Sequence, residues 1–213
     1  MSEERVRIFG ISRHRIGADG DGVTTLVALH GCPLQCAYCL NPQCKDTVNQ
    51  YLTATASETV ERCMIDNLYF IATGGGLTVG GGEPLLHPQF VHELRKAMPE
   101  EWNLNVETSL NVPADHLRWI LDDAKMIIID VKDLNADIYH KYTSCSIQRL
   151  MDNLQLIADR GMQHKCILRL PLIHRYNTTS DRNSSRLRLE DMGFEHFDEF
   201  DYIEPLTHQP FEP

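Results

Sequence analysis

Short apolar runs alternate with amphipathic stretches along most of this chain. The runs predict six strands, and the stretches between them carry apolar residues at helical spacing. The predicted strands span residues 23–30, 77–79, 104–106, 126–129, 166–170 and 202–203. The predicted helices span residues 57–71, 88–98, 113–121, 147–160 and 186–192. The fourth strand is apolar throughout, as expected of a strand buried on both faces of a parallel sheet.

Residue signals at the helix ends support these boundaries. Ser57 is placed to cap the first helix, and Pro88 stands in the first turn of the second. Gly161 follows the fourth helix as a C-cap. One face of the first helix is expected to carry Val60, Met64, Leu68 and Ile71.

Six strand-then-helix units in 213 residues predict an α/β fold with a parallel sheet and helices outside it. Eight such units would form a closed barrel of about 250 residues, which is longer than this chain. We therefore expect an open, partial barrel, with a doubly wound sheet as the alternative. In both folds the reactive groups lie at the carboxyl ends of the strands.

The composition is that of an ordinary globular protein, and its charge narrows the choice of partners. Apolar residues make up 42% of the chain and charged residues 23%. A net charge of −10 argues against non-specific binding to nucleic acid or anionic lipid. The sequence has no apolar run of membrane-spanning length and no segment resembling a signal peptide, so we expect a cytoplasmic protein.

Four of the seven cysteines fall between Cys32 and Cys44, which indicates a metal or catalytic site rather than a disulfide framework. Cys32, Cys36 and Cys39 form a C-x3-C-x2-C array directly after the first predicted strand. Three thiolates so close together can bind three irons of a [4Fe–4S] cluster and leave the fourth iron open to a small molecule. The alternative is a zinc site with Cys44 as fourth ligand, although no second cysteine pair of the zinc type is present. In the iron–sulfur interpretation, Cys44 is a bystander.

The segments GCPLQCAYCLNP and VGGGEP resemble the signature of the radical S-adenosylmethionine (SAM) superfamily. Within it, the sequence is most similar to activating enzymes of glycyl radical enzymes, of the pyruvate formate-lyase activase type. The shared motifs are DGDGV, CxxxCxYCxNP, TGGGLTVGGGEPLL, VETS and IIIDVKD. The resemblance implies a partial (β/α)6 barrel and one SAM-bound [4Fe–4S] cluster. We therefore expect a single radical SAM domain over residues 1–213, with residues 1–22 as an extension and 23–208 as the barrel core.

The resemblance also implies which residues bind the cofactors. Gly81, Gly82 and Glu83 belong to a motif that holds the methionyl amino group of SAM, and glycines let a ligand approach the backbone closely. Asp130 and Lys132 match a D-x-K pair, in which the Lys approaches the polar groups of SAM. The full set implied to bind SAM is Tyr38, Asn41, Gly81, Gly82, Glu83, Glu107, Thr108, Asp130, Lys132, Arg169 and His208.

A monovalent cation, Na+ or K+, is implied beside SAM. Glu107 and Thr108 stand where the family usually has Asp-Thr, so one carboxylate is longer by a methylene. Hard cations prefer oxygen ligands, and Glu107, Asp130 and the carbonyl of Ile128 are chemically suitable. The sequence leaves the presence of the cation open.

Two charge runs remain outside these motifs. Seven acidic residues lie within residues 190–204 with no Lys or Arg among them, which indicates a solvated face. A basic group near the N-terminus comprises Arg5, Arg7, Arg13 and Arg15. A solvated edge is the simpler interpretation of this group, and docking of an acidic electron carrier, flavodoxin- or ferredoxin-like, is the alternative.

These features predict an oxidoreductase that reductively cleaves SAM at the cluster and generates a glycyl radical on a partner enzyme. One alternative is a radical SAM enzyme that modifies a peptide or small molecule. Another is a non-catalytic iron–sulfur or zinc-binding module. No ferredoxin-type cysteine set lies between Cys39 and Gly81, so auxiliary clusters are not expected. We expect a monomer that works under anaerobic conditions.

Overall fold

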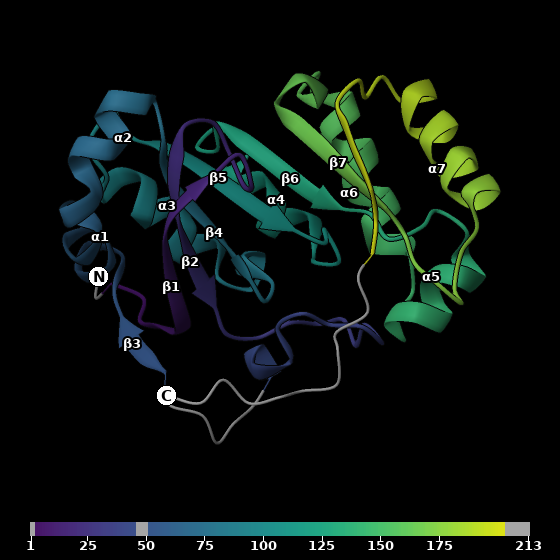
Figure 1. Cartoon of the computed structure of the whole chain (residues 1–213), viewed down its shortest axis with the longest axis horizontal. Coiled ribbons are helices and arrows are strands. Elements are labelled where there is room, and N and C mark those ends of the chain that lie inside the picture. The colour runs from purple at the N-terminus through teal and green to yellow at the C-terminus, as the bar shows by residue number, and fades with distance from the viewer. Residues whose placement is uncertain (1–2, 46–50, 203–213) are drawn as a thin grey trace.

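The computed structural model describes residues 3–45 and 51–202. Its centre is one eight-stranded sheet with the order β3-β1-β2-β4-β5-β6-β7-β8, curved and open between its edge strands (Figure 1). The strands are β1 (Val6–Ile16), β2 (Val23–Leu29), β3 (Leu52–Ala54), β4 (Gly76–Gly81), β5 (Asn103–Thr108), β6 (Met126–Asp130), β7 (Cys166–Leu172) and β8 (Phe197–Asp201).

β2 and the five strands from β4 to β8 are parallel, which confirms the predicted partial barrel. β1 and β3 add an antiparallel edge. β1 lies within residues 1–22, which the sequence assigned to an extension, so that boundary does not divide the sheet. The regular alternation of buried residues in β1 covers only Val6 and Ile8. Residues 12–15 of the strand are all polar and its register with β2 shifts twice, which explains why its pattern is weak.

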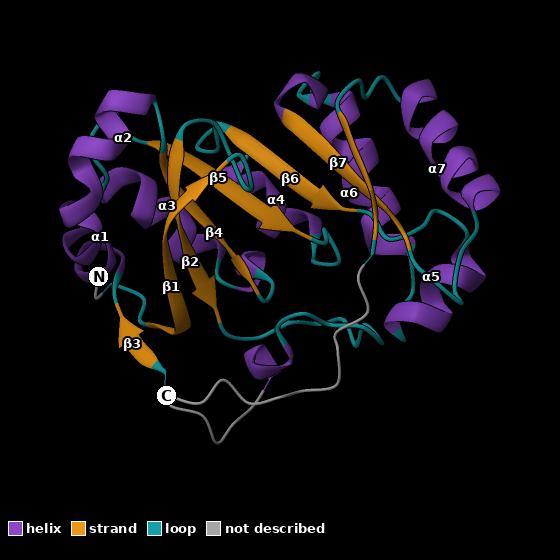
Figure 2. Ribbon diagram, in the orientation of Figure 1, coloured by secondary structure: helices purple, strands orange, loops and turns teal. Residues whose placement is uncertain are grey.

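Helices cover the outer face of the sheet (Figure 2). They are α1 (Ala56–Cys63), α2 (Asn67–Thr73), α3 (Pro88–Ala97), α4 (Ala114–Ile120), α5 (Ala136–Thr143), α6 (Gln148–Asp159) and α7 (Thr179–Asp191). In β6, Ile127 and Ile129 are fully buried beneath this layer, whereas Asp130 is only half-buried. Because side chains alternate along a strand, Asp130 points to the inner face, where the barrel is open. No helix among the described residues has both the length and the apolarity to cross a membrane.

The first predicted helix is broken in the structure. Thr55 rather than Ser57 is its N-cap, in a capping box with Glu58. A tight 3-10 turn over Met64–Asp66 separates α1 from α2 and shifts the phase of the residues that follow. Val60 is buried as expected, but the predicted common face is wrong. Met64, Leu68 and Ile71 are 44%, 75% and 52% exposed, and Phe70 takes the buried position instead.

Other elements also differ from the sequence prediction. α7 begins at Thr179, because Thr178 forms a capping box with Asp181 ahead of a polar stretch that lacks apolar periodicity. The last strand is β8, before the predicted residues 202–203. α5 was not predicted at all. It is short, and its buried residues are chiefly two tyrosines.

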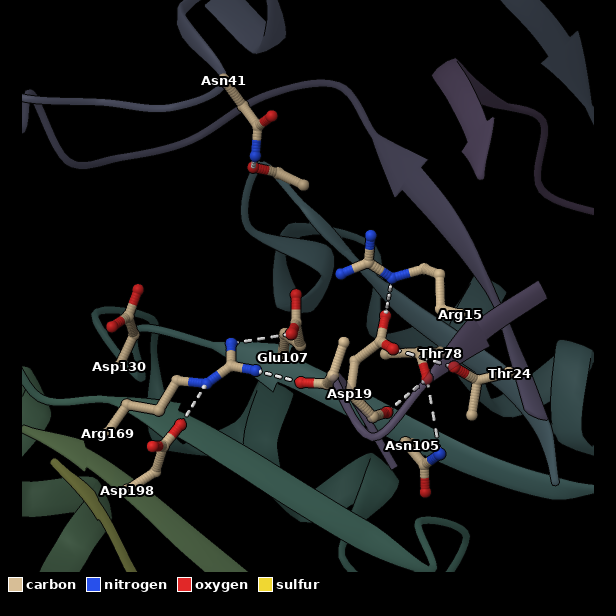
Figure 3. A network of polar contacts seen from close by, with 12 residues as sticks. Arg15, Asp19, Thr24, Asn41, Thr78, Asn105, Glu107, Asp130, Arg169 and Asp198 are labelled. Atoms are coloured by element: carbon tan, nitrogen blue, oxygen red, sulfur yellow. Dashed lines mark hydrogen bonds and ion pairs between the residues drawn. The ribbon is translucent and has the colours of Figure 1, made fainter. Parts of the chain in front are cut away.

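The connection between β1 and β2 closes the amino end of the sheet. Asp19 in this connection is 1% exposed. Its carboxylate accepts hydrogen bonds from Thr24 Oγ1 at 2.8 Å and Arg15 Nε at 2.6 Å, and its carbonyl accepts one from Thr78 Oγ1 at 2.7 Å (Figure 3). These contacts tie β1, β2 and β4 together at the end away from the cysteines.

Candidate cluster and SAM site

The loop that carries Cys32, Cys36 and Cys39 follows β2 at the carboxyl edge of the sheet. All three thiols are free and partly buried. The neighbours of Cys36 are fixed, because Gln35 N donates to the carbonyl of Thr143 at 2.8 Å and Ala37 N donates to the carbonyl of Tyr142 at 3.0 Å. The last carbonyls of a helix lack partners within that helix, so the end of α5 is well suited to hold this loop.

The other side of the cysteine loop contacts the glycine-rich end of β4. Asn41 Nδ2 donates to the carbonyl of Gly81 at 3.1 Å. Gly82 N donates to the carbonyl of Leu29, and Glu83 N donates to the carbonyl of Gly31. The two motifs that carry the family resemblance therefore lie side by side.

The thiols of the loop differ in acidity. Burial raises the pKa of Cys32 to about 12 and also raises that of Cys36. A hydrogen bond from the Cys44 thiol lowers the pKa of Cys39 to about 6, and Lys45 and Lys132 favour the thiolate further. Cys44 is buried against Cys39, and the hydrogen bond between the two thiols raises the pKa of Cys44.

The arrangement fits an iron–sulfur cluster better than a zinc ion. Among residues 3–45 and 51–202, no three His, Cys, Asp or Glu side chains are placed to hold one metal ion. A [4Fe–4S] cluster takes one thiolate per iron, so its cysteines need not converge on a single point. Three partly buried thiols of one loop, with two lysines nearby, suit such an anionic group.

The glycines at the end of β4 are required by packing. Gly81 has a φ of +86°, and a Cβ there would come within 2.7 Å of the Cβ of Ala28. A Cβ on Gly82 would lie 2.2 Å from the carbonyl oxygen of Gly31. Both glycines therefore let β4 approach β2 and the cysteine loop, and their contact with SAM stays a prediction.

Glu83 is fully buried below this edge. Its carboxylate accepts hydrogen bonds from Thr108 Oγ1 at 2.7 Å, from Ser109 N and Oγ at 2.8 and 2.6 Å, and from Leu85 N at 3.1 Å. Burial raises the pKa of Glu83, although these hydrogen bonds act in the opposite direction. Glu83 and Thr108 thus join the end of β4 to the end of β5 and shape the site from within.

Ion pairs occupy the inner face of the sheet (Figure 3). Arg169 Nη1 contacts Glu107 Oε1 at 2.7 Å, Arg169 Nη2 donates to the carbonyl of Ala18 at 2.6 Å, and Asp198 lies 3.5 Å from the Nε. Burial raises the pKa of Glu107, and the Arg169 guanidinium partly offsets this effect. Each of the two carboxylates implied for a cation has a basic partner, since Lys132 Nζ contacts Asp130 Oδ2 at 2.5 Å.

Lys132 is 7% exposed and has a φ of +66°. Burial lowers its pKa, but Asp130 and Cys36 together outweigh burial and raise it. The predicted D-x-K pair therefore lies beside the cysteine loop as a formed ion pair.

Two predicted site residues remain, Tyr38 and His208. Tyr38 packs its ring against Tyr142 and Tyr176, which belong to elements far from it in the sequence. His208 lies outside the described residues. Sequence reasoning missed Tyr142, Tyr176 and Tyr202 beside the cysteine loop, and no local motif could have found them because each comes from a different element.

Comparisons with known proteins agree with this geometry. Residues 26–180 match the radical SAM superfamily profile. The (2S)-3-sulfopropanediol dehydratase activating enzyme of Klebsiella oxytoca is 31% identical over 232 residues, covering 80% of this chain and 72% of the relative. The pyruvate formate-lyase 2-activating enzyme of Escherichia coli is 26% identical, covering 80% and 68%.

Two solved structures share the fold at low identity. SuiB of Streptococcus suis, bound to S-adenosylmethionine, has a TM-score of 0.58 at 12% identity, over 84% of this chain and 38% of that one. QueE of Escherichia coli has a TM-score of 0.51 at 11% identity, over 92% and 93%. The family implies a [4Fe–4S] cluster and SAM, for which the cysteine loop and the adjoining edge are suited. This chain belongs to the radical SAM superfamily and, within it, to the activating enzymes of glycyl radical enzymes.

Proposed function

We propose that this chain binds its cluster through Cys32, Cys36 and Cys39 and generates a glycyl radical on a partner enzyme. The observation that carries the proposal is the cysteine loop, which is fixed between the end of α5 and the glycine-rich end of β4. Its curated relatives named above are activating enzymes, which supports a protein substrate.

Cys32, Cys36 and Cys39 would hold the cluster, which would supply the electron for cleavage of SAM into methionine and a 5′-deoxyadenosyl radical, the species that would take a hydrogen atom from a glycine Cα. The residues of this chain orient SAM for that step. The half-buried backbone at Gly81 and the side chain of Asn41 are assigned to the methionyl end, next to the loop. Lys132 and Arg169 are assigned to polar groups of SAM, whose one anionic group is the methionyl carboxylate, since both side chains are cationic and face the inner side of the sheet.

An open sheet suits a substrate that is itself a protein. A segment of backbone can enter from the side where no further strand continues β8 in the described part of the chain (Figure 1). Leu40, between Cys39 and Asn41, is 63% exposed and would meet such a segment.

The test uses the reconstituted, reduced protein with SAM and a glycyl radical enzyme from the same genome. We expect a long-lived glycyl radical signal by electron paramagnetic resonance (EPR), and deuterium from the substrate glycine should appear in 5′-deoxyadenosine. If the label instead comes from a free peptide or small molecule, with no radical on any protein, the activase assignment fails and the radical SAM assignment remains.

The cation is a finer proposal with its own test. If Glu107 and Asp130 share Na+ or K+ with SAM, the ion must coexist with Arg169 and Lys132, which already pair with them. Asp130→Ala should then weaken SAM binding while iron content is kept, and exchanging Na+ for K+ should alter turnover. Indifference to both changes would leave Asp130 as the partner of Lys132 alone.

The electron donor is proposed to be flavodoxin- or ferredoxin-like, but the basic group at the N-terminus gives this little support. Arg5, Arg13 and Arg15 form ion pairs within the protein, with Glu58, Asp66 and Asp19 respectively. Arg7 stacks on Tyr51 at 4.7 Å. A monomeric state and a cytoplasmic location stay predictions from the sequence.

A further inference from the structure

Four tyrosine side chains line the site on the side of Cys36. This tyrosine wall comprises Tyr38 in the cysteine loop, Tyr142 in α5, Tyr176 after β7 and Tyr202 after β8. Tyr142 is its centre, with ring centroids 5.0 Å from Tyr176, 6.2 Å from Tyr38 and 6.5 Å from Tyr202. The wall therefore packs three distant segments against the loop that carries the cysteines.

Tyr142 is held directly against the segment around Cys36. Its carbonyl accepts the hydrogen bond from Ala37 N, and the carbonyl of the next residue, Thr143, accepts the one from Gln35 N. Cys36 lies between these two anchored residues. Tyr142 is 1% exposed, so its side chain is packed within the protein, where its ring contacts that of Tyr38 in the cysteine loop.

The hydroxyl of Tyr142 has no hydrogen-bond partner among the described residues. Other tyrosine hydroxyls nearby are used, since Tyr202 donates to the carbonyl of Tyr38 at 2.5 Å and Tyr139 accepts from Asn111 at 3.0 Å. The Tyr202 hydroxyl lies near that of Tyr142 without the geometry of a hydrogen bond. A buried hydroxyl without a hydrogen-bond partner is unfavourable, so the unpaired Tyr142 hydroxyl at the centre of the tyrosine wall requires an explanation.

The groups around this hydroxyl include one candidate acceptor. Burial raises the pKa of Tyr142, and Tyr202, the Cys36 thiolate and Asp130 raise it further. Of these groups, a cysteine thiolate in an iron–sulfur site accepts hydrogen bonds, and such bonds help to set the reduction potential of the cluster.

We propose that Tyr142 is a positioning residue whose hydroxyl donates a hydrogen bond to the Cys36 thiolate in the cluster-loaded enzyme. The inference rests on the proposed role of Cys36 as a cluster ligand. A donor at this sulfur stabilises the reduced state more than the oxidised state, because the reduced cluster carries one more negative charge. Tyr142 therefore raises the reduction potential and eases the electron transfer that must precede SAM cleavage.

The test is Tyr142→Phe in the reconstituted full chain, with Tyr176→Phe as the matched control from the same wall. Iron content is measured first, and the midpoint potential is then measured by a redox titration followed by EPR. Tyr142→Phe should keep its iron and shift the midpoint to a more negative potential. At a fixed potential we expect about tenfold less reduced cluster relative to oxidised cluster, which corresponds to 59 mV for one electron. Tyr176→Phe should leave the midpoint unchanged.

A second substitution separates hydrogen bonding from packing. Replacement of Tyr142 by 3-fluorotyrosine keeps the ring and makes the phenol a stronger donor, so the midpoint should shift to a less negative potential. A midpoint unchanged by this replacement would overturn the proposal, even if Tyr142→Phe failed to assemble its cluster. The titration needs neither SAM nor a partner enzyme, so its result is independent of whether a glycyl radical is formed.

Discussion

Buried polar groups at the two ends of the sheet differ in how fully they are hydrogen-bonded within the protein. At the amino end, Asp66 is fully buried and accepts hydrogen bonds from Arg13 and Thr25, with His14 Nε2 3.0 Å away. Both carboxylate oxygens of Asp19 also accept hydrogen bonds, from Arg15 and Thr24. At the carboxyl end, the thiols of Cys32, Cys36 and Cys39 are partly exposed, and the buried Tyr142 hydroxyl has no partner in the described part of the chain.

This difference separates polar groups that hold the fold from polar groups that bind something else. A buried carboxylate whose oxygens already accept protein hydrogen bonds has less capacity left for a ligand. Location alone does not decide the role of a buried carboxylate, because Glu83 lies at the carboxyl end and accepts four protein hydrogen bonds. The predictions below test the contrast by making comparable changes at both ends.

The largest effect is expected from removing one thiol at each end. Cys36→Ala should reduce iron in the reconstituted protein from about four atoms per chain to background, because one iron loses its ligand. Cys166 is fully buried at the start of β7, at the amino end. Cys166→Ala should keep the iron and cost about 1 kcal/mol of unfolding free energy.

Iron analysis and urea unfolding check both variants. Loss of iron in Cys166→Ala would contradict the assignment of the site to one end of the sheet. Cys44→Ala provides a further control beside the site, since Cys44 contacts Cys39 but is not expected to bind iron. If Cys44→Ala lost its iron as Cys36→Ala does, a four-thiolate site would be indicated instead.

The next effect is expected at Glu83. Glu83→Gln places an amide NH2 among the donors of Thr108, Ser109 and Leu85, so about 3 kcal/mol of unfolding free energy should be lost. SAM affinity should also fall, because the backbone of Gly82 is fixed beside Glu83. Glu101→Gln, on the surface, is the matched control and should change neither quantity. Unchanged stability in Glu83→Gln would show that this carboxylate does not hold the edge.

A smaller effect is expected at the amino end from Asp66→Asn. Burial raises the pKa of Asp66, but hydrogen bonds from Arg13 and Thr25 outweigh burial, so the pKa lies below its ordinary value of 3.8. The charged form therefore stabilises the fold above the unfolded pKa, and this contribution is lost as the pH falls through the folded pKa. Asp66→Asn should cost about 2 kcal/mol at pH 7 and less near pH 3, while iron content and SAM affinity stay unchanged.

Unfolding free energies at the two pH values, measured with and without the substitution, check this expectation. Equal costs at both values would mean that Asp66 acts through packing alone. A loss of SAM affinity would contradict the separation between the two ends of the sheet.

The sequence was sufficient for the features that are local and repetitive. Apolar runs identified the parallel strands β2, β4, β5, β6 and β7, and the order of strands brought the cysteine array and the glycine-rich segment to one edge. Contacts over long sequence separations could not be predicted. Arg13 and Asp66 are 53 positions apart, and the tyrosine wall collects one residue from each of four segments. The polar half of β1 carries too little periodicity to be recognised as a strand.

The smallest effect is expected where the sequence pattern was misleading. An unbroken helix over residues 57–71 would place Leu68 on the same face as the buried Val60, whereas the turn before α2 leaves Leu68 75% exposed and buries Phe70 completely. Leu68→Lys should therefore change the unfolding free energy by less than about 0.5 kcal/mol. Phe70→Ala, two positions away, should cost about 3–5 kcal/mol because it leaves a cavity under α2. If Leu68→Lys were the more damaging of the two, the helix would run without a break and the exposed face would belong to the core.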